Sequence, residues 1–512
     1  MPPSKTERSS SKEIARKNRA AEIANTFEWV ITAIILALFF RAFVMEAYRI
    51  PTGSMADTLK GAHFRLRCPQ CGYRYDYGFV PEEYGLPPDT IPRGFLKLTS
   101  SRCPSCGHYQ PTGGTMPIAN GDRILVLKCI YQLFEPMQWD VIVFKNPLEP
   151  QINYIKRLVA RPGETVEIID GDIYINGQIS RKPPKVQNKL WMPVYDNDYQ
   201  PVRPRERSFN YHFWQRPFKN IADSKWRLEK DSPTVFRLDS PSDQINWLVY
   251  DTSIGNNFRA TYAYDHVREY EHMPYCSDLM VRFYSLSAEP EGRIGIELSK
   301  YQNRYKAWVN FTGEMVIAKV KKGKEIVELA HKYIELPGIN KSTLLKFANV
   351  DHQLIFQFGT EKLTYDLGRS PGDAGERATD IQPQVKIFGS GKLKLSHIAI
   401  FRDIHYTAAK SANRPKSARA TEGNPLTLAK DEFFVLGDNS PSSEDGRWWN
   451  KPGIGNNGLF YEPGIVPRDY LVGKALFVYW PSGFKPFAKS PFAIIPDVGQ
   501  MRFIYGGSNK NP

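Results

Sequence analysis

A serine and a lysine stand in two short motifs that together could perform acyl transfer. Ser54 lies in Pro-Thr-Gly-Ser-Met, residues 51–55, and Lys156 lies in Tyr-Ile-Lys-Arg, residues 154–157. A serine hydroxyl is a weak nucleophile at neutral pH and needs a base to take its proton. A lysine amine can be that base if burial lowers its pKa from about 10.4 toward about 7–8. Lys156 is a candidate because the predicted strand around it is apolar.

A third motif, Gly-Asp-Asn-Ser-Pro-Ser-Ser-Glu-Asp-Gly-Arg, occupies residues 437–447 and contains several polar candidates: Asp438, Ser443, Asp445 and Arg447. Taken alone, Gly-Asp-Asn is an ordinary turn sequence. Asp445 and Arg447 alone could be a surface ion pair worth less than about 1 kcal/mol. The chain has nine histidines, and none has the sequence context of a Ser-His-Asp triad. Lysine is therefore the better candidate for the base.

An apolar segment ends just before the first motif. Residues 27–45 contain few charges, and a membrane span needs about 20 mostly apolar residues. Six basic residues precede the segment: Lys5, Arg8, Lys12, Arg16, Lys17 and Arg19. By the positive-inside rule they would keep the N-terminus in the cytoplasm. A cleavable signal peptide starts similarly, but no small-x-small cleavage pattern follows, so we expect a retained single-pass anchor over residues 26–45.

Two Cys-Pro-x-Cys-Gly units form a CxxC…CxxC pattern from Cys68, Cys71, Cys103 and Cys106. The spacing is typical of a structural zinc ribbon with four thiolate ligands. Such a site has no open coordination position, so the metal would not take part in catalysis. Two disulfides are the alternative, because a domain outside the cytoplasm meets oxidising conditions.

The remaining pattern predicts a mainly β protein. The chain has 512 residues, of which 39 are Pro and 37 are Gly, a composition that favours turn-rich β structure. Short alternating strands recur over residues 233–406, as in a jelly-roll β-sandwich. Two hairpins are expected at Asp170-Gly171 and Asn176-Gly177. The net charge of +14 is dispersed apart from the N-terminus, so we predict no nucleic-acid binding.

The three motifs, in this order behind an anchor, resemble those of the bacterial type I signal peptidases. Residues 50–55 are similar to the family's Ile-Pro-Ser-Gly-Ser-Met, residues 154–157 with Pro162-Gly163 to its lysine motif, and residues 437–447 to Gly-Asp-Asn-x-x-x-Ser-x-Asp-Ser-Arg. The resemblance covers less than half of the chain. It implies a membrane-bound serine endopeptidase with a Ser-Lys dyad, and no cofactor for catalysis.

The resemblance also implies residue roles. Ser54 would be the nucleophile and Lys156 the general base. Thr52 would help the Ser54 N–H to form the oxyanion hole, and Ser443 would orient the lysine amine. The remaining implied site residues are Asp438 in the turn, the supporting pair Asp445 and Arg447, and Ile50 and Ile155 in a substrate pocket for a small side chain. Departures from the family pattern include Gly446 for Ser, Arg161 for Leu and Trp139 for Gly.

The implied substrates are signal-peptide-bearing pre-proteins. The implied location is the cytoplasmic (inner) membrane, with the catalytic domain on the outer, periplasmic side. The predicted organisation places a zinc ribbon and a β-sandwich as insertions in a β catalytic core, which they divide into three segments. In chain order we expect a basic tail (1–25), the anchor (26–45), the first core segment (46–67), the ribbon (68–114), the second core segment (115–180), a connector (181–232), the sandwich (233–406), a linker (407–424), and the third core segment with a C-terminal tail (425–512).

Three other classes of protein share some of these features. Self-cleaving repressor proteases share Ser-Lys chemistry, but they carry a DNA-binding domain and no anchor. A non-enzymatic anchored binding protein would have no need for the intact site residues. A zinc-ribbon nucleic-acid binder would not place its ribbon outside the membrane. For the sandwich, Trp247, Tyr250 and Trp308 could bind an unknown ligand, but core packing is the expected use of such aromatic residues.

Overall fold

The structure is a computed structural model. It describes residues 5–87, 90–91, 95–110, 113–206, 209, 212–266, 272–321, 325–377, 381–407, 418–456, 458, 460–482 and 497–507. Most of the predicted linker, residues 407–424, lies outside these ranges. The mainly β class predicted from the sequence is confirmed.

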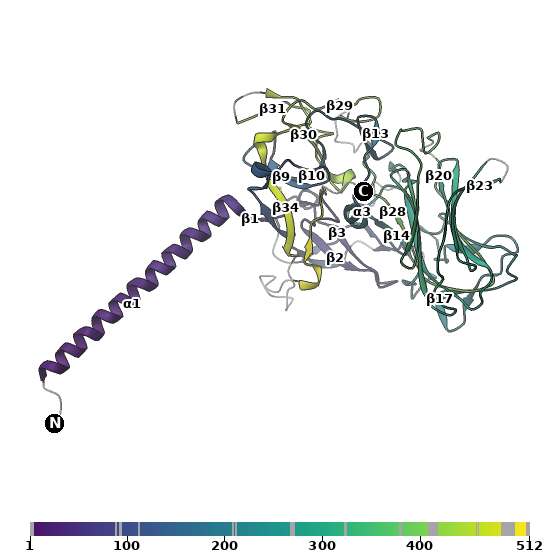
Figure 1. Cartoon of the computed structure of the whole chain (residues 1–512), viewed down its shortest axis with the longest axis horizontal. Coiled ribbons are helices and arrows are strands. Elements are labelled where there is room, and N and C mark those ends of the chain that lie inside the picture. The colour runs from purple at the N-terminus through teal and green to yellow at the C-terminus, as the bar shows by residue number, and fades with distance from the viewer. Residues whose placement is uncertain are drawn as a thin grey trace.

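A long helix at the N-terminus, α1 (Lys5–Phe39), continues into a π-helical turn at Phe40–Val44. Figure 1 shows α1 extending away from the rest of the molecule as a single rod. Residues 22–44 have a mean hydropathy of 2.0 and are unburied, and among the described residues this is the one helix long and apolar enough to cross a membrane. Exposed apolar side chains such as Trp29 and Leu36 give the helix an apolar surface over this stretch.

The catalytic motifs are attached to an eight-stranded sheet in the order β1-β8-β34-β9-β10-β30-β33, with β35 paired to β34. Its strands are β1 (Met45–Arg49), β8 (Arg123–Leu127), β9 (Val141–Lys145), β10 (Asn153–Ala160), β30 (Glu432–Leu436), β33 (Val466–Pro467), β34 (Leu471–Trp480) and β35 (Arg502–Phe503). All five residues of β30 are buried, as expected of a strand covered on both faces. The sheet therefore unites segments that are far apart in the sequence.

A four-stranded sheet, β13-β12-β11-β29, lies next in the chain. It contains β11 (Thr165–Ile169), β12 (Asp172–Ile175), β13 (Gln178–Ile179) and β29 (Leu426–Thr427). Both predicted hairpins are confirmed, since β11 pairs with β12 and β12 with β13. Asp170 and Gly171 both have positive φ, as a two-residue type I′ turn requires.

The cysteine motifs belong to a further small sheet, β3-β2-β7-β4, and a two-stranded pair, β5-β6. The strands are β2 (His63–Arg67), β3 (Arg74–Gly78), β4 (Phe95–Lys97), β5 (Ser101–Arg102), β6 (Tyr109–Gln110) and β7 (Thr115–Ala119). Their apolar side chains form a separate core that includes Phe64 and Tyr77. Short elements elsewhere are α2 (Ile130–Leu133), β31 (Gly453–Ile454) and β32 (Phe460–Tyr461).

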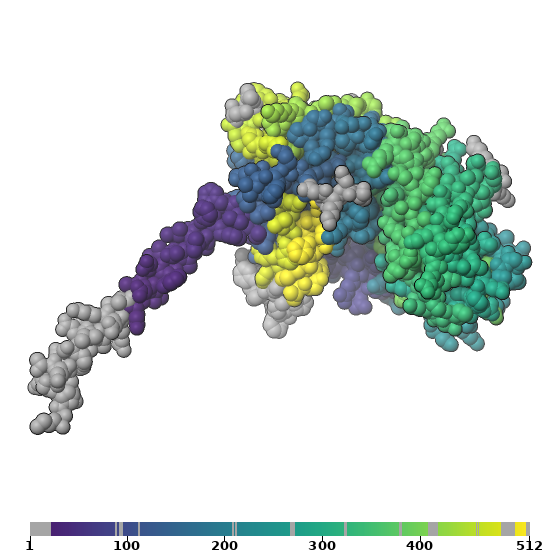
Figure 2. Space-filling model, in the orientation of Figure 1, coloured from purple at the N-terminus to yellow at the C-terminus, as the bar shows by residue number. Residues whose placement is uncertain are grey.

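Two large antiparallel sheets pack face to face and form the sandwich, which is the teal-to-green lobe in Figure 2. One has the order β16-β17-β28-β19-β24-β25-β26, with β14 also on β28, and the other β15-β18-β27-β20-β21-β22-β23. Their main strands are β17 (Ser232–Asp239), β18 (Asn246–Tyr250), β19 (Leu279–Ser287), β20 (Arg293–Lys300), β21 (Asn303–Asn310), β22 (Glu314–Val320), β23 (Ile326–Tyr333), β24 (Thr343–Val350), β25 (Gln353–Phe358), β26 (Glu361–Asp366), β27 (Val385–Ser390) and β28 (Lys392–Arg402).

The segment expected to be an irregular connector contains regular elements. It holds α3 (Pro184–Leu190), β14 (Met192–Asp196), β15 (Phe218–Asn220) and β16 (Arg227–Glu229), and its three strands pair with sandwich strands. Strands of three to five residues show few full alternations of polar and apolar side chains, so their period is weak in the sequence. Their aromatic residues nevertheless fill the sandwich core.

A buried cluster of charged side chains lies between the four-stranded sheet that contains β12 and the sandwich. Lys300 pairs with Asp278 and lies 3.7 Å from Asp172 of β12, while Lys182 pairs with Asp351 and with Asp403 at 2.9 Å. The four carboxyl groups lie within 4.8 Å of one another. Burial raises the pKa of Asp403 to about 7, because two ammonium groups only partly offset four carboxyls. These contacts connect β12 and the segment after β13 to the sandwich.

Candidate active site

The Lys156 amine and the Ser54 hydroxyl meet in the structure. Lys156 Nζ lies 2.6 Å from Ser54 Oγ, a hydrogen-bond distance. Lys156 projects from β10, an inner strand between β9 and β30, and Ser54 lies in the turn that follows β1. The two side chains are buried, at 4% and 9% exposure. The sheet therefore brings together two groups that are 102 positions apart in the sequence.

Burial changes the basicity of this amine. It lowers the pKa of Lys156 to about 8, and the opposing attraction of Asp445 and Glu444 does not cancel the effect. Tyr154, two positions earlier on the same face of β10, places its ring 5.4 Å from the Lys156 nitrogen. An amine of this pKa is substantially neutral just above neutral pH, as a general base must be.

The turn that carries Ser54 is tightly hydrogen-bonded. The Ala56 N–H donates to Gly53 O at 3.0 Å, and the Ala62 N–H donates to Pro51 O at 3.1 Å. The Ser54 carbonyl accepts a hydrogen bond from the Asn439 N–H at 3.0 Å, which connects this turn to the Gly-Asp-Asn motif. Among the described residues no oxygen accepts a hydrogen bond from the Ser54 N–H, so this donor is available to an oxyanion.

Asp438 is held by a partner that the sequence did not assign. Arg157 Nε and Nη2 donate to its two carboxylate oxygens at 2.7 and 2.6 Å. The pairing follows from the strand register, because Arg157 of β10 faces Leu436 of β30, two residues before Asp438. Arg157 Nη1 also donates to the carbonyl of Trp139, a residue with a φ of 73° at a position where the resemblance expects glycine.

Asp445 and Arg447 form a second buried ion pair. Arg447 Nε and Nη2 donate to Asp445 at 2.9 and 2.7 Å, and both side chains are fully buried. Burial would raise the pKa of Asp445, but Arg447, the Gly437 N–H and the Ser443 hydroxyl outweigh it and lower that pKa. The alternative of a weak surface pair does not describe this geometry. The expected contact of Ser443 with the lysine amine stays a prediction.

Gly437 permits the close approach of these pieces. A Cβ atom added there would lie 2.1 Å from Ser443 Oγ and 2.5 Å from the Ser54 carbonyl oxygen. No side chain fits into that space, because real Cβ contacts are far longer. The glycine of the Gly-Asp-Asn motif is therefore the point at which the nucleophile turn and the last motif touch.

The remaining predicted site residues surround the turn. Ile50 is buried in an apolar cluster with Met55, and Ile155 packs against the same cluster. Thr52 lies on the exposed side of the turn. Ile50 and Ile155 therefore share one apolar cluster with the residue after Ser54, and Thr52 is at the surface.

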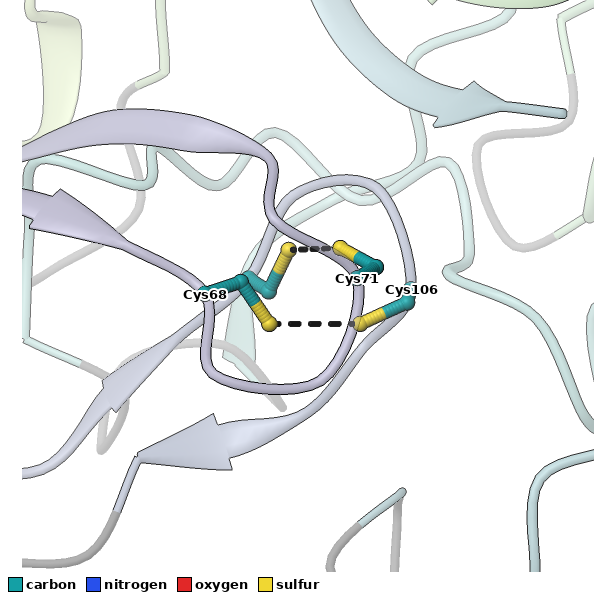
Figure 3. Close-up of side chains that lie close together, drawn as sticks. Cys68, Cys71 and Cys106 are labelled. Atoms are coloured by element: carbon teal, nitrogen blue, oxygen red, sulfur yellow. Dashed lines mark hydrogen bonds between the residues drawn. The ribbon is translucent and has the colours of Figure 1, made fainter. Parts of the chain in front are cut away.

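Four cysteines gather at the tips of two similar loops (Figure 3). Cys68 Sγ lies 3.7 Å from Cys106 Sγ, and Cys71 Sγ lies 3.7 Å from Cys103 Sγ. A disulfide needs about 2.05 Å between sulfurs, whereas a tetrahedral zinc site with bonds of about 2.3 Å has edges of about 3.8 Å. All four sulfurs lie within 4.8 Å of one another, so the thiols fit a zinc ion.

The aromatic residues considered for ligand binding in the sandwich have different positions. Tyr250 is buried in its core and donates a hydrogen bond to the Asn256 carbonyl at 2.9 Å. Trp247 and Trp308 are half-buried and pack near Phe388, and the Lys306 ammonium lies 4.7 Å from the Trp247 ring. Packing accounts for Tyr250, as expected from the sequence.

A family model described as signal peptidase, peptidase S26, matches residues 107–217 and 395–480. These segments contain Lys156 and the motif at residues 437–447. Ser54 lies outside them, and its assignment rests on its own motif and on its distance from Lys156.

Curated proteins named signal peptidase I are similar to stretches of the chain. The protein of Aquifex aeolicus (strain VF5) is 60% identical over 95 residues, which are 19% of this chain and 34% of that protein. The protein of Rickettsia canadensis (strain McKiel) is 28% identical over 151 residues, 29% of this chain and 42% of that protein. The chain therefore spans less than half the length of each of these two relatives.

Solved structures also resemble a portion of the chain. A carbohydrate binding module, CBM66, from Bacillus subtilis matches 36% of this chain at 8% sequence identity. The match includes 95% of that module and has a TM-score of 0.24. Sheep galectin-11 covers 25% at 9% identity, with 94% of its length and a TM-score of 0.19. Likeness at this level carries no conclusion about a ligand.

Proposed function

We propose that this chain is a member of the signal peptidase family, peptidase S26, and a membrane-anchored serine endopeptidase that removes N-terminal signal peptides from exported pre-proteins. The observation that carries the proposal is the 2.6 Å contact between the buried Lys156 amine and the Ser54 hydroxyl. Such a pair can perform acyl transfer without a histidine or a metal ion in the catalytic steps.

In the first half of the reaction, neutral Lys156 takes the proton of Ser54 as Oγ attacks the scissile carbonyl carbon. The resulting oxyanion accepts a hydrogen bond from the Ser54 N–H, with Thr52 as the second donor. The lysine ammonium then gives its proton to the leaving amine, the C–N bond breaks, and the signal peptide remains as an ester on Ser54.

In the second half, Lys156 is neutral again and takes a proton from water. The resulting hydroxide attacks the ester carbonyl, and the ammonium returns the proton to Ser54 as the acyl bond breaks. Ser443 orients the amine, and the Asp445–Arg447 pair holds the loop that carries Ser443. Ile50 and Ile155 form the pocket for the small residue before the scissile bond, and their shared apolar cluster supports this role.

The anchor brings this chemistry to the membrane. Residues 26–45 would span the cytoplasmic membrane, with the basic tail in the cytoplasm and the catalytic core on the outer side. The apolar helix ends at Val44, directly before β1 of the catalytic sheet begins at Met45, so Ser54 would lie a few residues beyond the lipid. A substrate whose own signal peptide is in the bilayer would meet the nucleophile there.

The ribbon (68–114) and the sandwich (233–406) are, in this proposal, insertions in the catalytic core. The four cysteines would hold a structural zinc ion that stabilises the ribbon loops. The geometry of the thiols supports zinc over disulfides.

Cleavage of a purified pre-protein in detergent tests the proposal. The wild type should cut it at the end of the signal peptide, and Ser54→Ala and Lys156→Met should lose cleavage while keeping the wild-type circular dichroism spectrum. Ser442→Ala, at an exposed serine of the last motif, is the control and should stay active. Cleavage by folded Ser54→Ala would refute the nucleophile assignment.

A further inference from the structure

A segment of the sandwich unit reaches into the catalytic site. Residues 262–265, Tyr-Ala-Tyr-Asp, lie in the long connection between the sandwich strands β18 and β19. Tyr262 and Tyr264 nevertheless pack in one buried cluster with Ala56, which follows Ser54 by two positions. No motif of the catalytic site includes this segment.

Tyr264 fixes the turn that carries the nucleophile. Its ring lies so close to Gly53 that a Cβ atom at Gly53 would be 2.2 Å from Tyr264 Cε1. Its hydroxyl donates to the Ala62 carbonyl at 3.0 Å, and its own carbonyl accepts the Gly78 N–H at 2.8 Å. One side chain therefore contacts the residue before Ser54 and the end of the same turn.

Tyr262 and Asp265 contact the Gly-Asp-Asn motif. The Tyr262 hydroxyl donates to the Asp438 carbonyl at 3.0 Å, in a buried position. Asp265 Oδ1 accepts a hydrogen bond from Asn439 Nδ2 at 2.7 Å. Since the Asn439 N–H donates to the Ser54 carbonyl, Asp265 is two hydrogen bonds away from the nucleophile.

A cavity borders one end of this segment. The cavity has a volume of about 370 Å³ and is lined by Thr261, Tyr262 and Ala263 together with Asp57 of the nucleophile turn. The segment therefore borders both this cavity and the nucleophile turn.

We propose that residues 262–265 are a positioning segment, supplied by the sandwich insertion, that holds the Ser54 turn and the Gly-Asp-Asn motif against each other and so keeps Ser54 at the Lys156 amine. This inference rests on the proposed Ser-Lys chemistry. It makes the sandwich unit a component of the catalytic assembly rather than a separate appendage.

Three substitutions test the segment by removing one polar contact each: Tyr262→Phe, Tyr264→Phe and Asp265→Ala. We expect kcat for pre-protein cleavage to fall about tenfold or more in at least Tyr262→Phe and Asp265→Ala, with KM within about twofold, because the substrate pocket is untouched. A looser site admits water, so the midpoint of the rate against pH should move upward from that of the wild type.

Two control variants make the result specific. Tyr284→Phe removes the hydroxyl of an exposed tyrosine elsewhere in the sandwich and should leave kcat unchanged. Asp265→Asn keeps an oxygen that can accept from Asn439, so it should restore most of the activity lost in Asp265→Ala. Variants that lose thermal stability but keep the wild-type kcat and pH midpoint would overturn the inference.

Hydrogen exchange gives a readout that needs no substrate. Amides in residues 51–62 and 437–440 should exchange faster in Tyr262→Phe and Asp265→Ala than in the wild type, while the sandwich strands keep their protection. Unchanged exchange in both segments would overturn the positioning role. If the wild type cleaves no pre-protein, the proposed function fails, and the exchange result still decides whether the segment holds the turn.

Discussion

Arg157 holds the carboxylate of Asp438 in a two-bond ion pair inside the protein, with both side chains almost completely buried. Arg157 directly follows Lys156 on β10, so the pair ties the lysine strand to the Gly-Asp-Asn motif. A paired Arg and Asp carry no net charge, and the lysine amine gains little stabilisation of its protonated form from Asp438. The pair thus positions the site without holding Lys156 in its protonated form.

Replacing Asp438 by Ala should destabilise the protein strongly. The substitution leaves the buried Arg157 guanidinium without its carboxylate, which typically costs about 3–5 kcal/mol. Urea unfolding followed by tryptophan fluorescence measures the change. Glu164→Ala breaks the more exposed pair of Glu164 with Arg161 and should cost less than about 1 kcal/mol. Equal losses of unfolding free energy in the two variants would contradict a larger contribution from the buried Arg157–Asp438 pair.

Lys156→Met should stabilise the protein at pH 7 while it abolishes catalysis. The folded protein lowers the pKa of Lys156 to about 8 from 10.5, so the unfolded chain binds this proton more tightly. The contribution of Lys156 to the free energy of unfolding is therefore most unfavourable below pH 8, and it becomes less unfavourable as the pH rises from about 8 to about 10.5.

The expected gain of Lys156→Met at pH 7 is about 1–3 kcal/mol, reduced by the lost hydrogen bond to Ser54. The gain should shrink by pH 10, where the folded protein holds a neutral lysine. Denaturant titrations of both proteins at the two pH values provide the measurement. A difference in stability that does not depend on pH would show that the amine is not buried with a lowered pKa.

The cleavage rate should rise with pH. Only neutral Lys156 can accept the Ser54 proton, so kcat/KM of the free enzyme should increase about tenfold per pH unit below its midpoint near pH 8 and then level off. Initial rates between pH 6 and pH 10, on a peptide without titrating groups near the cleavage site, give the profile. A rate that falls through neutral pH would argue against a lysine base.

Purified protein should contain about one zinc ion per chain. Cys71→Ser should lose the metal and lower the thermal midpoint, because zinc binding contributes directly to the stability of such loops. Cys129→Ser, at a cysteine outside the cluster, should keep the metal. Metal analysis and thiol titration make the measurement, and oxidised thiols with no metal would favour two disulfides instead.

Local motifs made the chemistry of the site predictable from the sequence. Ser54, Lys156 and the last motif each lie in a short distinctive pattern, and the hairpin at Asp170-Gly171 follows from turn chemistry alone. The Arg157–Asp438 pair was not predicted, since it depends on the register between β10 and β30, two strands far apart in the chain. Residues 262–265 fall inside the predicted sandwich without a motif of their own, and only tertiary packing shows what they contact.

The strand order of the catalytic sheet has a consequence for the synthesis of the protein. β30 neighbours β10 in space but follows the whole sandwich in the chain. A nascent polypeptide that stops before β30 contains both Ser54 and Lys156, but it lacks the strand that pairs with one edge of β10 and the motif at residues 437–447. The site described above is therefore complete only after the residues that follow the sandwich have been synthesised.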